Sequence, residues 1–139
     1  MTATGATGPA EVVRAFYAAI EAGRHGEDLA GFLAPDARTV ERPNALVPGG
    51  RVSGRAEMLA ASTAGAGLLA GQRYDVASVV ESGDLVVTRL RWTGVVARSV
   101  GPFAEGQTLT AQIAQFVRVT GGLISEIETY DCYEPFDGG

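Results

Sequence analysis

Residues 108–133 read TLTAQIAQFVRVTGGLISEIETYDCY, two runs rich in β-branched residues separated by a pair of glycines. Gly121 and Gly122 are a favoured pair for a two-residue turn, so the pattern predicts a β-hairpin. If these glycines form the turn, Thr120 pairs with Leu123 and the register follows by counting outward. The count predicts three further pairs on the same face: Phe116 with Ile127, Ala114 with Thr129, and Gln112 with Asp131.

The predicted face changes in character along the hairpin. It begins with large apolar residues near the turn, narrows to Ala114 and Thr129, and ends in the polar pair Gln112 and Asp131. This order is typical of a small-molecule pocket with an apolar floor and one reactive end. Burial would raise the pKa of an Asp131 carboxyl there, which suits a general acid or base near neutral pH. The alternative is a one-residue bulge, which would reverse the faces, or a position of Asp131 beyond the sheet, in solvent.

The remaining sequence predicts helices packed on a single sheet. Three-to-four spacing of apolar residues predicts helices over residues 9–23 and 55–69, and a shorter helix over 26–36 that Pro35 stops. The predicted strands cover residues 37–43, 73–81, 85–100, 108–119 and 123–133, and residues 44–54 form a loop rich in Gly and Pro. We therefore expect one α+β domain over residues 1–139, ordered from about 9 to 136, with about three helices on one face of a curved, mostly antiparallel sheet.

Composition excludes several functional classes. The net charge is −5 and no basic stripe exists, so nucleic acid is not an expected partner. All 11 basic residues counted as Lys+Arg are arginines, which excludes a lysine Schiff base, and the single Cys132 and single His25 exclude a metal site of several cysteines or histidines. No signal peptide or membrane-spanning run is visible, so we expect a cytoplasmic protein that needs no cofactor or metal and does not bind membranes.

Several strings in this order are similar to a known superfamily. VVRAFYAAIEAG, FLAPDARTVERP, RWTG and GGLISEIETYDCYEP together resemble the nuclear transport factor 2-like superfamily over residues 11–136. This is the cone-shaped fold of SnoaL-like polyketide cyclases, ketosteroid isomerases and limonene epoxide hydrolases, and YDCYEP looks most like an uncharacterised bacterial SnoaL-like branch. The resemblance implies a cone with an internal pocket, and often a homodimer formed through the outer face of the sheet.

The sequence departs from the ketosteroid isomerases at their functional positions. Their catalytic aspartate corresponds to Arg42, preceded by Glu41, and their oxyanion-hole tyrosine and acid correspond to Phe16 and Ala114. The isomerase machinery is therefore absent. Glu41 and Arg42 are adjacent in a predicted strand, so only one of them can face the pocket. An inward Arg42 could hold Asp131 or an anionic substrate group, whereas an inward Glu41 would give the pocket a second carboxylate.

The epoxide hydrolases of this fold use an Asp–Arg–Asp arrangement to activate water. The last of these aspartates aligns with Asp131, whereas the other two residues fall near Leu90 and Trp92, which cannot do that work. The resemblance therefore supports Asp131 alone as a residue that faces the pocket.

These observations predict binding of a small, largely apolar carbonyl-type molecule and cofactor-independent acid–base chemistry of the cyclase or isomerase type. The catalytic candidates are Asp131 and Glu41. The substrate-binding candidates are Phe16, Tyr17, Arg42, Asn44, Trp92, Gln112, Ala114, Phe116, Ile127 and Thr129. The rival prediction is a non-catalytic binding or dimerisation module, and a third is epoxide-hydrolase-like water activation. The predicted dimer stripe on the outer face comprises Ile113, Gln115, Val117, Glu126, Glu128 and Tyr130.

Overall fold

The computed structural model describes residues 8–136, which form three helices and six strands. Expectations for the N-terminal segment and the last three residues lie outside this range. The helices are α1 (Pro9–Glu21), α2 (Glu27–Ala30) and α3 (Arg55–Leu68), and the strands are β1 (Leu33–Glu41), β2 (Arg51–Gly54), β3 (Leu69–Ser82), β4 (Leu85–Val96), β5 (Thr108–Thr120) and β6 (Leu123–Tyr133). None of the helices within residues 8–136 has the length and apolar composition needed to cross a bilayer.

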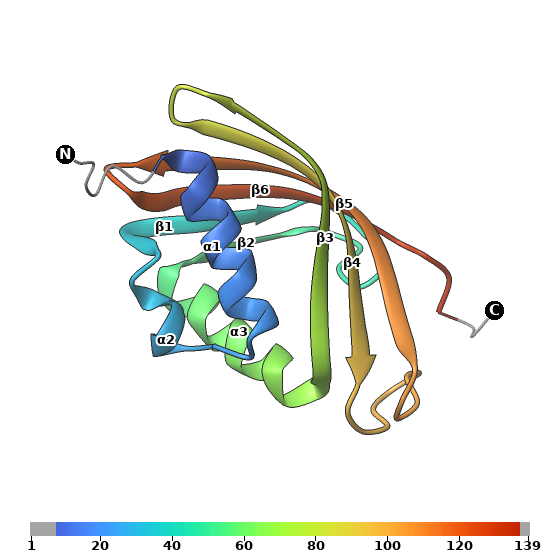
Figure 1. Ribbon diagram of the computed structural model, residues 1–139. Coiled ribbons are helices and arrows are strands. Elements are labelled where there is room, and N and C mark those ends of the chain that lie inside the picture. Colours follow the sequence, from blue (N-terminus) through green and yellow to red (C-terminus); the bar gives the residue numbers. More distant parts are fainter. Residues whose placement is uncertain (1–7, 137–139) are drawn as a thin grey trace.

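The six strands form one sheet in the order β2-β1-β6-β5-β4-β3. Every neighbouring pair is antiparallel except β1 and β6, which are parallel. The sheet curves around α1, which crosses its concave face, and α2 and α3 lie beside α1 on the same side (Figure 1). The predicted α+β cone is confirmed.

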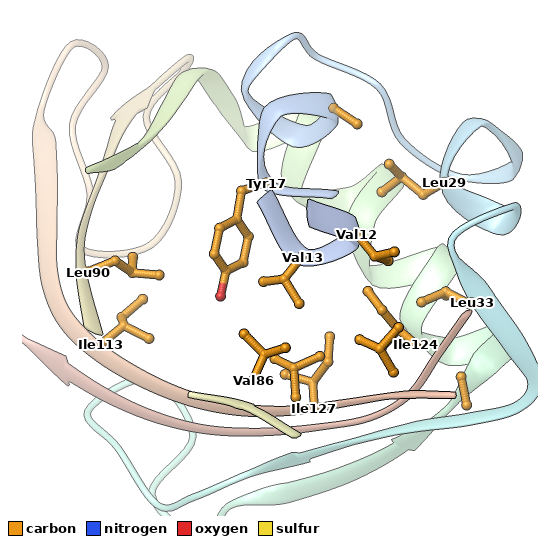
Figure 2. Packing of buried hydrophobic residues seen from close by; sticks show 14 of the residues in the cluster. Val12, Val13, Tyr17, Leu29, Leu33, Val86, Leu90, Ile113, Ile124 and Ile127 are labelled. Carbon is orange, nitrogen blue, oxygen red and sulfur yellow. The ribbon is translucent and has the colours of Figure 1, made fainter. Parts of the chain in front are cut away.

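Helix α1 covers the sheet because its apolar residues fall on one side. Pro9 occupies the first turn, where a missing N–H costs nothing, and the Glu11 carboxylate accepts the Gly8 N–H at 3.3 Å. Val12, Val13 and Tyr17 are buried against the sheet. The Tyr17 hydroxyl points from the helix down toward the strands (Figure 2).

The core lies between α1 and the concave face of the sheet (Figure 2). Its most deeply buried aliphatic residues are Val13, Val86, Leu90, Val117 and Ile124. Burial of a side chain of this kind stabilises the fold by roughly 1.5–3 kcal/mol. This face of the sheet is therefore fixed by packing, and polar groups on it are held in defined places.

Three predicted elements are corrected by the structure. The predicted helix over residues 26–36 ends at Ala30, and β1 begins at Leu33, because the backbone here pairs with β6: the Ile124 N–H donates to the Phe32 carbonyl at 2.8 Å. The predicted loop over residues 44–54 contains β2, which pairs with the end of β1 from Glu41↔Arg51 to Arg38↔Gly54. The strand predicted over residues 85–100 ends at Val96.

The hairpin turn is as predicted, but the register beyond it is not. Gly121 and Gly122 adopt φ of 60° and 82°, as a tight hairpin turn requires, and Thr120 pairs with Leu123. Ser125 is then an extra residue between the pairs Val119↔Ile124 and Arg118↔Glu126, that is, a β-bulge. Beyond the bulge the pairs are Val117↔Ile127, Gln115↔Thr129, Ile113↔Asp131 and Gln112↔Cys132, so three of the predicted pairs are wrong.

The bulge changes which residues of β5 share a face with Asp131. Gln112, Ala114 and Phe116, predicted for the pocket, lie on the outer face, because the inner positions belong to the buried Ile113 and Val117. The predicted outer stripe is wrong for the same reason in its β5 half, Ile113, Gln115 and Val117. Its β6 half is outward as predicted, and comprises Glu126, Glu128 and Tyr130.

Candidate functional site

A cavity of about 280 Å³ lies between α1, α3 and the concave face of the sheet. Its floor is apolar and one end is polar. The apolar lining residues are Phe16, Ile20, Leu29, Leu33, Met58, Leu59, Ala61 and Ile127, and the polar ones are Thr39, Glu41, Arg51, Ser53, Ser62, Gln115 and Thr129. An apolar hollow with polar groups at one end can bind a small, mostly apolar molecule and orient its polar group.

Glu41 supplies a carboxylate at the polar end. Its side chain is only 16% exposed, and it pairs with Arg51 at 3.1 Å and accepts the Asn44 amide N–H at 3.0 Å. Arg42, the next residue in the strand, lies on the outer face, where it pairs with Glu128 at 2.5 Å and its guanidinium lies 5.9 Å from the centre of the Tyr130 ring. The alternative left open by the sequence is therefore decided: Glu41 faces the cavity and Arg42 does not.

Asp131 lies on the inner face of β6, two residues beyond Thr129, which lines the cavity. Asp131 itself is half-buried, and its Oδ1 accepts a hydrogen bond from the Thr129 hydroxyl at 2.5 Å. Burial raises the pKa of the Asp131 carboxyl, the Thr129 hydrogen bond partly opposes this rise, and the nearby charge of Glu41 adds to it. The carboxyl is therefore half-buried and hydrogen-bonded, not fully exposed.

A chain of hydrogen bonds connects Asp131 to helix α1. The Gln115 Nε2 donates to the Thr129 hydroxyl oxygen at 3.1 Å, and the Gln115 Oε1 accepts the Tyr17 hydroxyl at 2.6 Å. The Tyr17 hydroxyl also meets Thr88 Oγ1 at 2.9 Å, and burial raises the pKa of Tyr17 to about 12. Tyr17 is therefore a neutral phenol at physiological pH, fixed by bonds to β4 and β5.

Two further tyrosines, Tyr74 and Tyr133, lie near enough to Asp131 to be affected by its charge. Tyr74 stacks on Tyr17 with ring centres 4.8 Å apart, and Tyr133 meets Trp92 edge-on with centres 6.2 Å apart. Burial, and then the negative charge of Asp131 among other neighbouring groups, raise the pKa values of both Tyr74 and Tyr133. These two phenols therefore lie within electrostatic reach of the carboxylate and stay protonated.

The structure divides the predicted site residues into four groups. Phe16, Glu41, Ile127 and Thr129 line the cavity. Tyr17, Trp92 and Asp131 lie on the same side of the sheet, beyond the lining, whereas Asn44 supports the loop, with its Oδ1 accepting the N–H groups of Leu46 and Val47. Arg42, Gln112, Ala114 and Phe116 lie on the outer face.

Sequence reasoning missed five polar residues that line the cavity: Thr39, Arg51, Ser53, Ser62 and Gln115. A signal for Gln115 was present, because Ile124 and Ile127 are both apolar at an odd spacing, which one face of a regular strand cannot accommodate. A bulge between them puts Gln115 opposite Thr129. Arg51 lies in the short strand β2 between glycines, and we see no signal in the sequence that would have assigned it.

A larger hollow of about 480 Å³ adjoins the cavity and shares Ile20, Ala61 and Ser62 with it. It lies between the ends of α1 and α3 and the start of β3. Its one carboxylate, Glu21, is exposed and already accepts the Tyr74 N–H at 2.7 Å. We therefore place the site in the smaller cavity, which combines an apolar floor with buried polar groups.

Across the part of the chain that the structure describes, no three His, Cys, Asp or Glu side chains are grouped to hold a metal ion.

The SnoaL-like domain family matches residues 13–127. The chain belongs to this family. IdmH, a putative polyketide cyclase from Streptomyces antibioticus, is 25% identical to this SnoaL-like chain, with 88% of this chain and 91% of IdmH aligned at a TM-score of 0.73. No curated protein sequence matches the chain significantly.

Two further solved structures share the fold of this SnoaL-like chain. A nuclear transport factor 2-like protein from Burkholderia thailandensis is 20% identical over 89% of this chain and 90% of its own, with a TM-score of 0.67. A protein of ketosteroid isomerase-like fold from Catenulispora acidiphila, in complex with trimethylamine, is 19% identical over 86% and 84% of the two chains, also with a TM-score of 0.67. At these identities the likeness concerns the fold.

Proposed function

We propose that this SnoaL-like protein binds a small, largely apolar carbonyl compound in the cavity and performs cofactor-independent proton transfer on it, as a cyclase or isomerase does. The observation that carries the proposal is the half-buried, hydrogen-bonded Asp131 carboxylate beside Thr129, at the polar end of an otherwise apolar cavity. A carboxyl whose pKa is raised toward the working pH accepts a proton from carbon more effectively than an exposed one.

The two carboxylates near the cavity have different partners and therefore different proposed roles. Glu41 is engaged by Arg51 and Asn44, so its side chain is fixed in place, where it can bind a polar substrate group or orient Arg51 toward that group. Asp131 receives one side-chain hydrogen bond, from Thr129, and has no ion-pair partner within residues 8–136. We therefore assign the proton transfer to Asp131. Pairs of carboxyl groups in unlike environments are a common way to separate such roles.

Two of the solved relatives support the proposed use of the cavity for small molecules. IdmH is a putative polyketide cyclase, and the Catenulispora protein was solved with a small organic molecule bound. Both relations support a cavity used for small molecules.

The proposal is tested by exchange of an acidic C–H proton. The ketone 2-tetralone is small and mostly apolar, and loss of its α-proton signal in D₂O can be followed by NMR. We expect the protein to accelerate exchange and Asp131→Asn to reduce the acceleration by about 10²-fold or more, the usual contribution of a positioned base. Asp36→Asn is the matched control, because Asp36 is exposed, and it should leave the rate unchanged.

The same experiment separates the enzyme from a binding module. Saturable shifts of cavity resonances on addition of 2-tetralone, with no acceleration of exchange by the wild-type protein, would favour binding without catalysis. Equal acceleration by wild type and Asp131→Asn would remove Asp131 from the proposed role.

We also propose that two copies of the chain associate through the outer face of the sheet. The support is a pair of exposed aromatic residues in edge contact, Phe116 at 37% and Tyr130 at 42% exposure, beside the Arg42–Glu128 ion pair. Sedimentation equilibrium should give twice the chain mass of 14.4 kDa. Phe116→Asp should shift the mass toward one chain, and a wild-type protein that stays at one chain mass would contradict the proposal.

A further inference from the structure

The hydrogen-bond chain between α1 and Asp131 has a defined direction. Thr129 has one hydroxyl proton, and its oxygen already receives the Gln115 Nε2–H at 3.1 Å, so the proton is free to point at Asp131, 2.5 Å away. Gln115 is in turn oriented by Tyr17, whose hydroxyl donates to the Gln115 Oε1 at 2.6 Å. Each donor in this chain therefore points toward the carboxylate.

The primary amide of Gln115, in the middle of this hydrogen-bond chain, determines whether the hydrogen-bond chain can transfer a proton. Gln115 accepts through oxygen and donates through nitrogen, and these are different atoms, so a proton cannot pass through it without an unfavourable imidic acid form. The chain is therefore unsuited to carrying a proton to or from Asp131. It is suited to orientation: a hydrogen bond donated to the charged form of a carboxyl favours that form, and neighbouring bonds in a chain strengthen one another.

We propose that Gln115 and Tyr17 are positioning residues that keep the Thr129 hydroxyl directed at Asp131, so that Asp131 awaits its substrate as a proton acceptor. The inference rests on the proposed function and adds to it the choice between acid and base. Before reaction Asp131 is the base, and it becomes an acid only after it has taken the substrate's proton.

The other titratable groups around Asp131 do not perform this task. Glu41 of β1 is a like charge, which opposes ionisation, and Arg51 of β2 is engaged with Glu41. Tyr17 of α1, Tyr74 of β3 and Tyr133 of β6 are neutral wherever a carboxyl titrates, because burial raises the pKa of each phenol. The chain through Gln115 is therefore the arrangement on the inner face that favours the charged form of Asp131.

The test measures the titration of Asp131 directly, by NMR of its ¹³C-labelled carboxyl carbon, assigned with Asp131→Asn. Gln115→Met keeps the side-chain size and removes the amide, and Tyr17→Phe removes the hydroxyl that orients it. We expect both variants to shift the Asp131 midpoint to higher pH. Tyr74→Phe is the matched control: its ring stacks on Tyr17 at 4.8 Å, but its hydroxyl is outside the chain, so the midpoint should not move.

The acid limb of the 2-tetralone exchange profile should shift in the same direction, while a merely structural defect would lower the rate without moving the midpoint. An Asp131 midpoint equal to that of wild type in either folded variant would overturn the inference, whatever the exchange rate. The NMR titration needs no turnover. Failure of the proposed function, seen as equal exchange by wild type and Asp131→Asn, is therefore distinguishable from failure of this inference.

Discussion

The inner and outer faces of the β5–β6 hairpin are built from alternating residues of the same two strands, yet their side chains have unlike surroundings. On the inner face Gln115, Thr129 and Asp131 form a hydrogen-bonded series beside the core. On the outer face Phe116 and Tyr130 meet edge-on with ring centres 5.9 Å apart, and both are exposed.

This contrast is clearest for two acidic residues three positions apart on β6. Burial raises the pKa of Asp131, whereas hydrogen bonds from Arg42 and Tyr130 lower the pKa of Glu128. The functional groups are the same, so the difference comes from the face and its partners. The environment of each acidic residue on this hairpin therefore depends on which face of the sheet its side chain occupies. The bulged residue Ser125 determines which residues of β5 and β6 share a face.

Deletion of Ser125 should have the largest effect, because it removes the bulge. Every residue of β6 after that point would then change faces: Ile127 would turn outward and Glu128 would turn into the core. Burying unpaired charge while exposing core residues costs more than about 4–5 kcal/mol, a large part of the stability of a domain this size. We expect loss of cooperative thermal unfolding, measured by circular dichroism.

Ser125→Ala is the control for this deletion, because it retains the extra residue and loses only a long hydrogen bond from the hydroxyl to the Arg118 carbonyl, at 3.4 Å. Its melting temperature should stay close to that of wild type. A deletion variant that unfolds as cooperatively as Ser125→Ala would show that the register of β6 is not fixed by the bulge.

The sequence was sufficient for elements with long, consistent patterns. Helices α1 and α3, the turn at Gly121 and Gly122, and the four long strands were all predicted, because apolar periodicity over ten or more residues reports burial directly. The inward position of Asp131 was also predicted. It held because Ile127 and Thr129, on the same side of β6, are buried.

The predictions that were wrong or left open depended on contacts between segments that are distant in the sequence, which the pattern within one strand does not report. The faces of β5 depended on Ser125, whose effect is visible only when apolar spacing is compared across the bulge. The choice between Glu41 and Arg42 depended on partners from distant segments, Arg51 in β2 and Glu128 in β6. The short helix predicted over residues 26–36 was overridden where β1 pairs with β6, a tertiary contact that local propensity cannot report.

Asp131→Asn should change stability less than the deletion, and in the favourable direction at neutral pH. The folded-state pKa of Asp131 is raised above the ordinary value of 3.8, so ionisation costs folding free energy, and this cost grows as pH rises through the raised pKa. Asparagine lacks the charge but keeps an oxygen for the Thr129 hydroxyl. We expect a gain on the order of 1 kcal/mol in urea unfolding at about pH 7, shrinking as pH falls toward about 4.

A gain that is constant between these pH values would contradict the assignment, because it would not follow the charge of Asp131. A loss of stability at neutral pH would show that the carboxylate is held by more than the Thr129 hydrogen bond.

Glu128→Gln, its counterpart on the outer face, should give the smallest effect and the opposite sign. The folded-state pKa of Glu128 is lowered, first by its hydrogen bond from Arg42, so its contribution is present above the ordinary value of 4.5 and is lost as pH falls through the lowered pKa. The variant should therefore be slightly less stable than wild type at about pH 7 and equal to it at low pH. Because the pair is exposed, about 1 M salt should remove most of the difference, whereas the Asp131→Asn gain should persist. If the two substitutions shifted stability in the same direction with pH, the two faces would not differ electrostatically in the way their partners require.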